Sequence, residues 1–207
     1  MENLALTFAS GWGSGLNSYL VVLVLGIAER VSDTDRIPHA LGSWPVLLVA
    51  GLLYALEFVG DKIPYVDSAW DGVSTFIRPV VGAVIGVLLA GDASSLDQAV
   101  LAAVGGGSAL ASHTVKAGSR LAVNASPEPF TNIGMSLGED GLVLSVITLA
   151  VHHPHLAAAI AAVLLVAGLV LVGLLARTIR RGWRRWKAKD GVEPLFRWQR
   201  TSHGSGA

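Results

Sequence analysis

One stretch limits what this chain can fold into more than any other. The 21 residues from Leu156 to Ala176 are apolar and contain no charged side chain. About 20 apolar residues of helix are enough to cross the hydrocarbon core of a bilayer, which is roughly 30 Å thick. The stretch therefore predicts a transmembrane helix. Composition agrees, because only 14% of the 207 residues are charged, compared with about 25% in a typical soluble domain.

Further apolar stretches predict more spans, although several are short or interrupted. They cover residues 4–28, 45–60, 75–91, 98–115 and 133–151. The first is interrupted by SGWGSGLN, and the second and third are short enough that either could be re-entrant. We therefore expect an all-α membrane protein with about six transmembrane helices, some short or broken, in a polytopic domain formed by residues 1–176.

The remaining residues, 177–207, form a basic tail that contains tryptophan. Residues 177–200 hold nine of the fifteen Lys and Arg residues and only two acids. Basic residues that follow a span indicate its cytoplasmic end, and tryptophan and basic side chains favour the membrane surface. We expect the tail to meet anionic headgroups of the inner (plasma) membrane and not nucleic acid. Six spans would then place both termini in the cytoplasm.

Polar side chains recur within the apolar stretches at helical spacing, three or four residues apart. An ionisable group at the centre of a membrane costs about 2.5–3.5 kcal/mol on insertion scales, and such groups usually line a functional cavity or pair with one another. The candidate solute- and ion-binding residues are Asn17, Glu57, Asp61, Arg78, His113, Lys116, Arg120, Asn124, Glu128, Glu139 and Asp140.

These residues suggest separate roles in binding. Glu57 or Glu139 would carry a proton or a cation, whereas Lys116 and Arg120 would bind an anionic group. His113 is a candidate proton relay, because its charge changes near neutral pH. The alternative is that these groups form structural ion pairs. With Lys62 counted, four acids and four bases would make a neutral cluster in the cytoplasmic half.

The turn SPEPF holds Glu128 between two prolines, which restrict the backbone on both sides. Asp67 and Asp71 are candidate Mg²⁺ ligands in the loop after the second span. They would equally suit the start of a short interfacial helix, where acids are favoured. No other cofactor is expected, and the lack of cysteine excludes disulfides and thiolate-bound metals.

A short internal similarity relates GSGLNSY, residues 13–19, to GSALASH, residues 107–113. With three spans in each half, it suggests an inverted 3+3 repeat, a plan that many transporters share.

The motifs SGLNSYL, LEFVGDKIPYVDSAWD, FIRPVVGA and VKAGSRLAVNASPEPFTNIGMSLGED occur in this order between the spans. In these motifs the chain resembles a bacterial integral-membrane family catalogued as a domain of unknown function, over roughly residues 9–175. The resemblance implies that the polar motifs are hallmarks of the family, and it implies no activity.

We expect a small inner-membrane transporter or permease, rather than an enzyme, with a cytoplasm-facing charged cavity for a small anionic or proton-coupled solute. One alternative is a Mg²⁺-dependent membrane enzyme that acts on a lipid or prenyl phosphate. Another is a non-catalytic membrane scaffold. The chain is also a candidate homo-oligomer.

Overall fold

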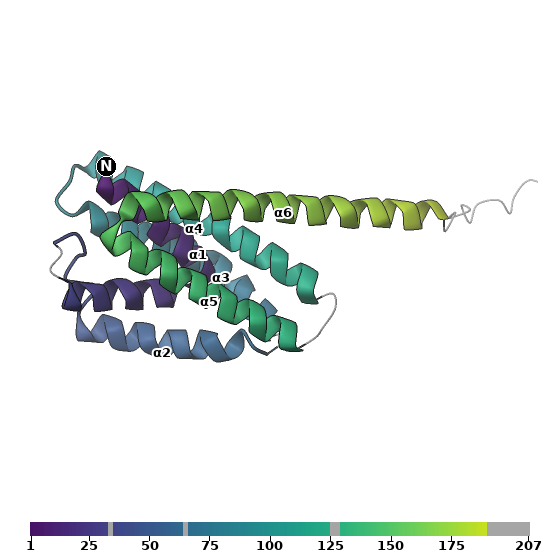
Figure 1. Ribbon diagram of the computed structural model, residues 1–207, viewed down its shortest axis with the longest axis horizontal. Coiled ribbons are helices and arrows are strands. Elements are labelled where there is room, and N and C mark those ends of the chain that lie inside the picture. Colours follow the sequence, from purple (N-terminus) through teal and green to yellow (C-terminus); the bar gives the residue numbers. More distant parts are fainter. Residues whose placement is uncertain (33–34, 64–65, 125–128, 190–207) are drawn as a thin grey trace, which may run out of the picture. The chain divides into compact units, whose positions relative to one another are not determined.

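The computed structural model describes residues 1–32, 35–63, 66–124 and 129–189, apart from the side chains of residues 67–68, 122–124, 129–132 and 185–189 (Figure 1). All secondary structure in these residues is helical, as the apolar stretches predict. The helices are α1 (Glu2–Val31), α2 (Trp44–Gly60), α3 (Val66–Ala90), α4 (Ser95–Asn124), α5 (Pro129–His152) and α6 (Pro154–Lys189). The chain divides into two units, Met1–Val172 and Gly173–Ala207.

Four of the described helices are long and apolar enough to cross a membrane. They are α1, most of α3, most of α5 and the first 31 residues of α6, while α2 is apolar but shorter. Helix α4 is less apolar, because glycine, serine and a charged stripe interrupt it. The chain is therefore an all-α membrane protein, with six helices in the described residues, some of them short or broken.

Helix α1 is the broken one, and it folds back on itself. At Asn17 the backbone leaves the helical conformation, with φ −151° and ψ 97°. A straight helix of 30 residues would separate its ends by about 45 Å, yet Glu2 at the start forms an ion pair of 3.0 Å with Arg36, just beyond the end. Residues 2–16 and 18–31 are thus two arms of a helical hairpin, which we call the α1 hairpin.

The α1 hairpin corrects the expected topology, because residues 4–28 do not form one straight span. They run into the molecule and return to the end where they started. The Nδ2 atom of Asn3 donates to the carbonyl of Leu89, 3.0 Å away at the end of α3. The N-terminus therefore lies at the same end of the first unit as the α3–α4 connection (Figure 1). The sequence placed the N-terminus with the connection between α2 and α3, which lies at the opposite end.

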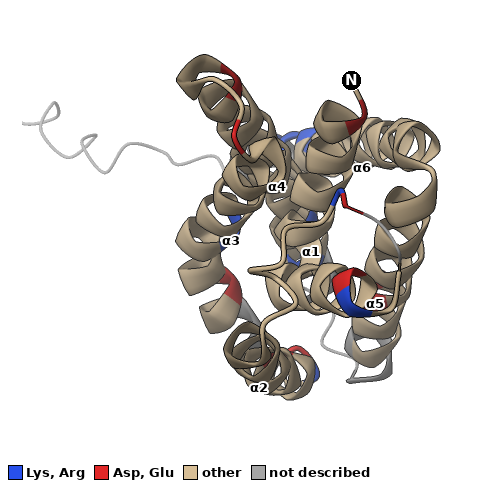
Figure 2. Ribbon diagram, turned by 90° about the vertical axis from the view of Figure 1, so that its left-hand side faces the viewer, with Lys and Arg blue, Asp and Glu red and all other residues tan. Residues whose placement is uncertain are grey.

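The α1 hairpin is central to the first unit, with α2, α3, α4 and α5 around it (Figure 2). Its apolar core includes Leu6 and Trp12 of α1 and Ile147 of α5. Helices α3 and α4 approach very closely: a Cβ atom on Gly105 would lie only 2.2 Å from the carbonyl oxygen of Gly82. Glycine at both positions therefore permits the contact that brings the polar faces of these helices against α1.

Candidate functional site

The apex of the α1 hairpin is fully enclosed by protein, and Asn17 is 1% exposed. The Oδ1 atom of Asn17 accepts a hydrogen bond of 3.0 Å from the backbone N–H of Leu20. An asparagine whose side chain accepts a hydrogen bond from the backbone N–H three residues later is a favourable helix N-cap. Asn17 thus separates the two arms of the hairpin. Its irregular backbone is tolerated in a membrane protein because it is buried in protein and not exposed to lipid.

The first arm ends with backbone carbonyls that have no partner within the helix, and two cations satisfy them. The carbonyl of Gly15 accepts from Arg78 Nη1 at 3.2 Å, and the carbonyl of Leu16 accepts from Lys116 Nζ at 2.9 Å. Positive charge is favourable at the C-terminal end of a helix, where the macrodipole is negative. The break in α1 therefore provides a binding point for two basic residues of other helices.

Arg78 of α3 lies at the centre of one set of contacts and is 1% exposed. Its Nη2 donates to Glu57 Oε1 of α2 at 2.6 Å, and its Nη1 lies 3.3 Å from Asp71 Oδ1. Nη1 also donates to Nδ1 of His113 on α4, at 2.7 Å. Three neighbouring helices are thus joined through one guanidinium group.

The contacts of His113 define its protonation state. Arginine can only donate hydrogen bonds, so Nδ1 of His113 must accept and carries no proton. The proton of the neutral ring is then on Nε2, which lies 2.9 Å from Thr75 Oγ1. Thr75 Oγ1 in turn donates to the backbone carbonyl of Asp71 at 2.9 Å. These contacts fit a neutral His113 ring that links Arg78 to Thr75, and a role in proton transfer stays a prediction.

Lys116 and Arg120 of α4 form a second set of contacts with α2 and α5. Lys116 Nζ lies 3.0 Å from Asp61 Oδ2, 3.3 Å from Glu139 Oε2 and 3.7 Å from Glu57 Oε1. Arg120 Nη2 lies 3.0 Å from the same Glu139 oxygen and 3.4 Å from the same Asp61 oxygen. These contacts match the alternative raised by the sequence, in which the charged groups form structural ion pairs.

Asp140, next to Glu139 on α5, has a different environment. Its Oδ1 accepts from Asn17 Nδ2 at 2.9 Å, and its Oδ2 accepts a longer bond of 3.5 Å from the Tyr54 hydroxyl. Among the residues that the structure describes, no Lys, Arg or His nitrogen forms an ion pair with Asp140. Both of its partners are neutral.

Together these charged residues form what we call the buried ion network, in which five acids face three bases. Lys62, which the sequence grouped with them, instead places its Nζ 3.0 Å from the centre of the Phe58 ring. Asp71 also belongs to the group through its ion pair with Arg78, which the sequence did not predict. The members are Glu57, Asp61, Asp71, Glu139, Asp140, Arg78, Lys116 and Arg120.

Helical spacing predicted most of the shared faces correctly, and it missed one. Glu57 and Asp61 lie on one buried face of α2, and Lys116 and Arg120 on one buried face of α4. The role of Asp71 in an ion pair was missed, although positions 71, 75 and 78 are also spaced by four and three residues.

Three candidate residues lie wholly or partly outside the described part of the chain. They are Glu128, the side chain of Asn124 and the side chain of Asp67. Within the described residues, no group of three or more His, Asp or Glu side chains is arranged to hold a metal ion. The Mg²⁺ prediction for Asp67 and Asp71 therefore gains no support from the side chains that are described.

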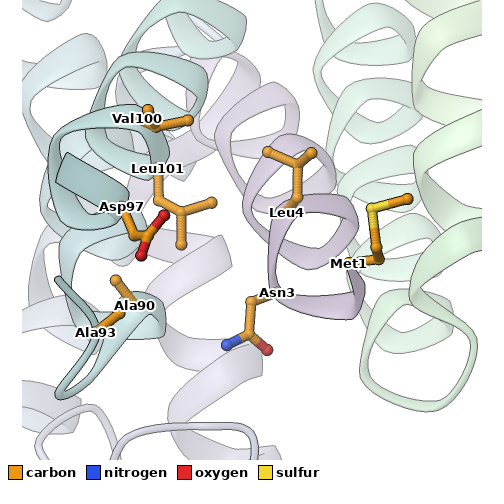
Figure 3. Close-up of a pocket in the computed structure, with 8 residues that line it drawn as sticks. All are labelled: Met1, Asn3, Leu4, Ala90, Ala93, Asp97, Val100 and Leu101. Atoms are coloured by element: carbon orange, nitrogen blue, oxygen red, sulfur yellow. The ribbon is translucent and has the colours of Figure 1, made fainter.

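A pocket of about 300 Å³ lies away from the network, at the end of the first unit that carries the N-terminus. Figure 3 shows apolar side chains of α1 and α4 lining it, including Leu4, Val100 and Leu101, with Asn3 and Asp97 as the polar members. The pocket shares no lining residue with the buried ion network.

Comparison with known proteins identifies a family. No curated protein and no solved structure matches the chain. A protein family described as Domain of unknown function (DUF4126) matches residues 4–173, which include most of the α1 hairpin and every member of the buried ion network. The chain belongs to this DUF4126 family.

Proposed function

We propose that the chain is a small multi-pass membrane transporter or permease for a small anionic or proton-coupled solute, with the buried ion network on the solute or ion route. The observation that carries the proposal is the position of this network at the apex of the α1 hairpin, among five helices of a membrane protein. Ionisable groups inside a membrane domain are costly, and they commonly mark substrate and ion pathways.

The broken helix supports the same proposal. In many transporters, discontinuous helices meet at the binding site, where free backbone carbonyls and helix ends bind ions and charged substrate groups. Here the free carbonyls of Gly15 and Leu16 hold Arg78 and Lys116. The inverted 3+3 repeat remains a prediction, and its two segments lie together, since Gly15 contacts Ser112 and Ala109.

The charge balance indicates how an anion and a proton would be coupled. Lys116 and Arg120 are held by carboxylates of Asp61 and Glu139, so an anionic solute must compete with these acids. An acid of the network that takes up a proton lowers the negative charge around these bases, and this favours the entry of an anion. Five acids around three bases give the network a negative excess that proton uptake would relieve.

Orientation and surroundings are part of the proposal. Lys62, Lys116 and Arg120 lie toward the end of the first unit that holds the α2–α3 connection, and basic residues favour the cytoplasmic side. If that end faces the cytoplasm and the chain lies in a bacterial inner membrane, the N-terminus is on the opposite, non-cytoplasmic side. The basic tail would bind anionic headgroups. No described contact favours the Mg²⁺-dependent enzyme or the scaffold over the transporter.

The test is reconstitution of the purified chain in liposomes that contain a pH-sensitive dye. Inorganic phosphate and short carboxylic acids are supplied outside as probe solutes, and proton entry that depends on one of them is the expected result. Glu57→Gln should abolish this flux while the protein stays folded, because it removes the charge that holds Arg78 Nη2 at 2.6 Å. Glu2→Gln, which alters only the surface pair with Arg36, is the matched control.

Two outcomes would contradict the proposal. One is that neither protons nor any probe solute enters faster than in liposomes without protein. The other is an unchanged proton flux in Glu57→Gln, which would show that the network is only structural.

A further inference from the structure

We infer that Asp140 is the proton-binding site of the buried ion network, and that the Asn17 side chain couples this site to the break in α1. The inference rests on the proposed function for its place in transport. Proton binding itself can be measured without any transported solute. It also differs from the expectation that Glu57 or Glu139 carries the proton.

The first argument compares the five acids of the network. Four of them have a basic nitrogen close by: Glu57 at 2.6 Å, Asp61 at 3.0 Å, Asp71 at 3.3 Å and Glu139 at 3.0 Å. A proton on any of these four carboxylates would remove the negative charge from an existing ion pair. Asp140 is half-buried and has only amide and phenol donors as direct partners.

The second argument concerns the charged groups that face Asp140 from the neighbouring elements. They are the acids Asp61, directly after α2, and Glu139 of α5, and the bases Lys116 of α4 and Lys62, also after α2. Lys116 is already shared among three carboxylates. The neighbour from α1 is the neutral Asn17. Asp140 is therefore the acid of the network whose proton uptake breaks no ion pair.

The third argument is the double role of the Asn17 amide. Its Nδ2 donates to Asp140 while its Oδ1 caps the second arm of the α1 hairpin through Leu20 N–H. When the carboxylate gains a proton, a charge-assisted hydrogen bond becomes a neutral one of roughly half the strength. One proton added to Asp140 thus loosens the side chain that fixes the hairpin apex, and its loss tightens that side chain again.

The experiment is infrared difference spectroscopy of the purified protein in lipid, stepped from alkaline to acid pH. A protonated carboxyl group has a C=O stretch that a carboxylate lacks, and we expect Asp140 to contribute one component of the band that appears on acidification. Asp140→Asn should remove this component, which the difference between the native and variant spectra isolates. Glu139→Gln, on the adjacent residue, is the control and should keep it. A band that is unchanged in Asp140→Asn, or a component that is lost only in Glu139→Gln, overturns the inference.

A second variant tests the coupling and remains informative if Asp140→Asn fails to fold. Asn17→Asp keeps an oxygen that can cap Leu20 but places a second carboxylate about as close to Asp140 as the amide is now, 2.9 Å. Two carboxylates in such contact share a proton. The band should therefore be present at a more alkaline pH than in the native chain. An unchanged pH dependence overturns the inference.

The infrared experiment and the liposome experiment test this inference and the proposed function separately. If the band is assigned to Asp140 and no probe solute moves in liposomes, the transporter proposal fails and the proton site stands. If transport occurs and the band does not respond to Asp140→Asn, the transporter proposal stands and this inference fails.

Discussion

Replacing Lys116 with methionine removes the base that contacts the largest number of acids in the buried ion network. Methionine keeps most of the length of the side chain and loses the charge. The carbonyl of Leu16 loses a hydrogen bond of 2.9 Å, and three carboxylates lose a cation within 3.7 Å. Each of these carboxylates keeps one arginine, so the network is weakened and not dismantled.

The expected cost follows from the burial of these groups. Removing one partner of a buried ion pair typically destabilises a protein by about 3–5 kcal/mol. For a chain of this size, about 1 kcal/mol corresponds to roughly 2–4 °C in melting temperature, so the loss should be about 6–20 °C. Protonation removes the charge of the abandoned carboxylates. The deficit should therefore be largest at alkaline pH, where all acids are ionised, and should shrink as the pH falls.

The assay is thermal unfolding in lipid nanodiscs, followed by circular dichroism across a range of pH. Lys62→Met is the matched control, because its ammonium group lies over the Phe58 ring and outside the network. It should cost at most about 1 kcal/mol, as expected for a cation–π contact near the surface. Equal effects of the two substitutions, or a Lys116→Met deficit that grows on acidification, would refute the reasoning.

Two further predictions concern the α1 hairpin. Gly15→Ala should destabilise the protein by about 1–3 kcal/mol, because the new methyl group would lie 2.1 Å from the carbonyl oxygen of Ala109 on α4. Gly107→Ala is the control: its methyl group meets nothing within 4 Å, and it should stabilise the helix by up to about 1 kcal/mol. Melting curves of the two variants measure the difference. Since the chain has no cysteine, Glu2→Cys, His39→Cys and Ile63→Cys can each be labelled with an impermeant maleimide. Residues 2 and 39 should react from one side of the membrane and residue 63 from the other, and joint labelling of residues 2 and 63 would show that α1 crosses.

The faces of α2 and α4 were predictable because helical spacing is a local property. Residues three or four apart share a face whatever the rest of the chain does. Glu57 with Asp61, and Lys116 with Arg120, could therefore be grouped from the sequence, and the cost of burying them predicted that they would find one another. Asp71 was misjudged for a related reason: an acid near the start of a helix is usually solvated, and only the approach of Arg78 makes it a buried partner.

The reversal of α1 could not be predicted from local pattern. SGWGSGLN is compatible with a kinked helix that continues and with one that turns back. The reversal is stabilised by bonds from Arg78 to Gly15 and from Lys116 to Leu16, which are 63 and 100 residues apart in sequence. Such distant partners leave no periodic signal near Asn17. The same holds for Asp140, whose amide partner is 123 residues away.

These sequence separations also have a consequence for how the protein is made. Chains emerge from the ribosome N-terminus first, so the two arms of the α1 hairpin are synthesised before the bases that bind its apex. Arg78 arrives with α3 and Lys116 only with α4. Until then the free carbonyls of the apex have neither base as a partner, and unsatisfied backbone groups are not stable in hydrocarbon. The α1 hairpin is therefore synthesised before the residues that complete its hydrogen bonds, and its stable insertion depends on the synthesis of α4.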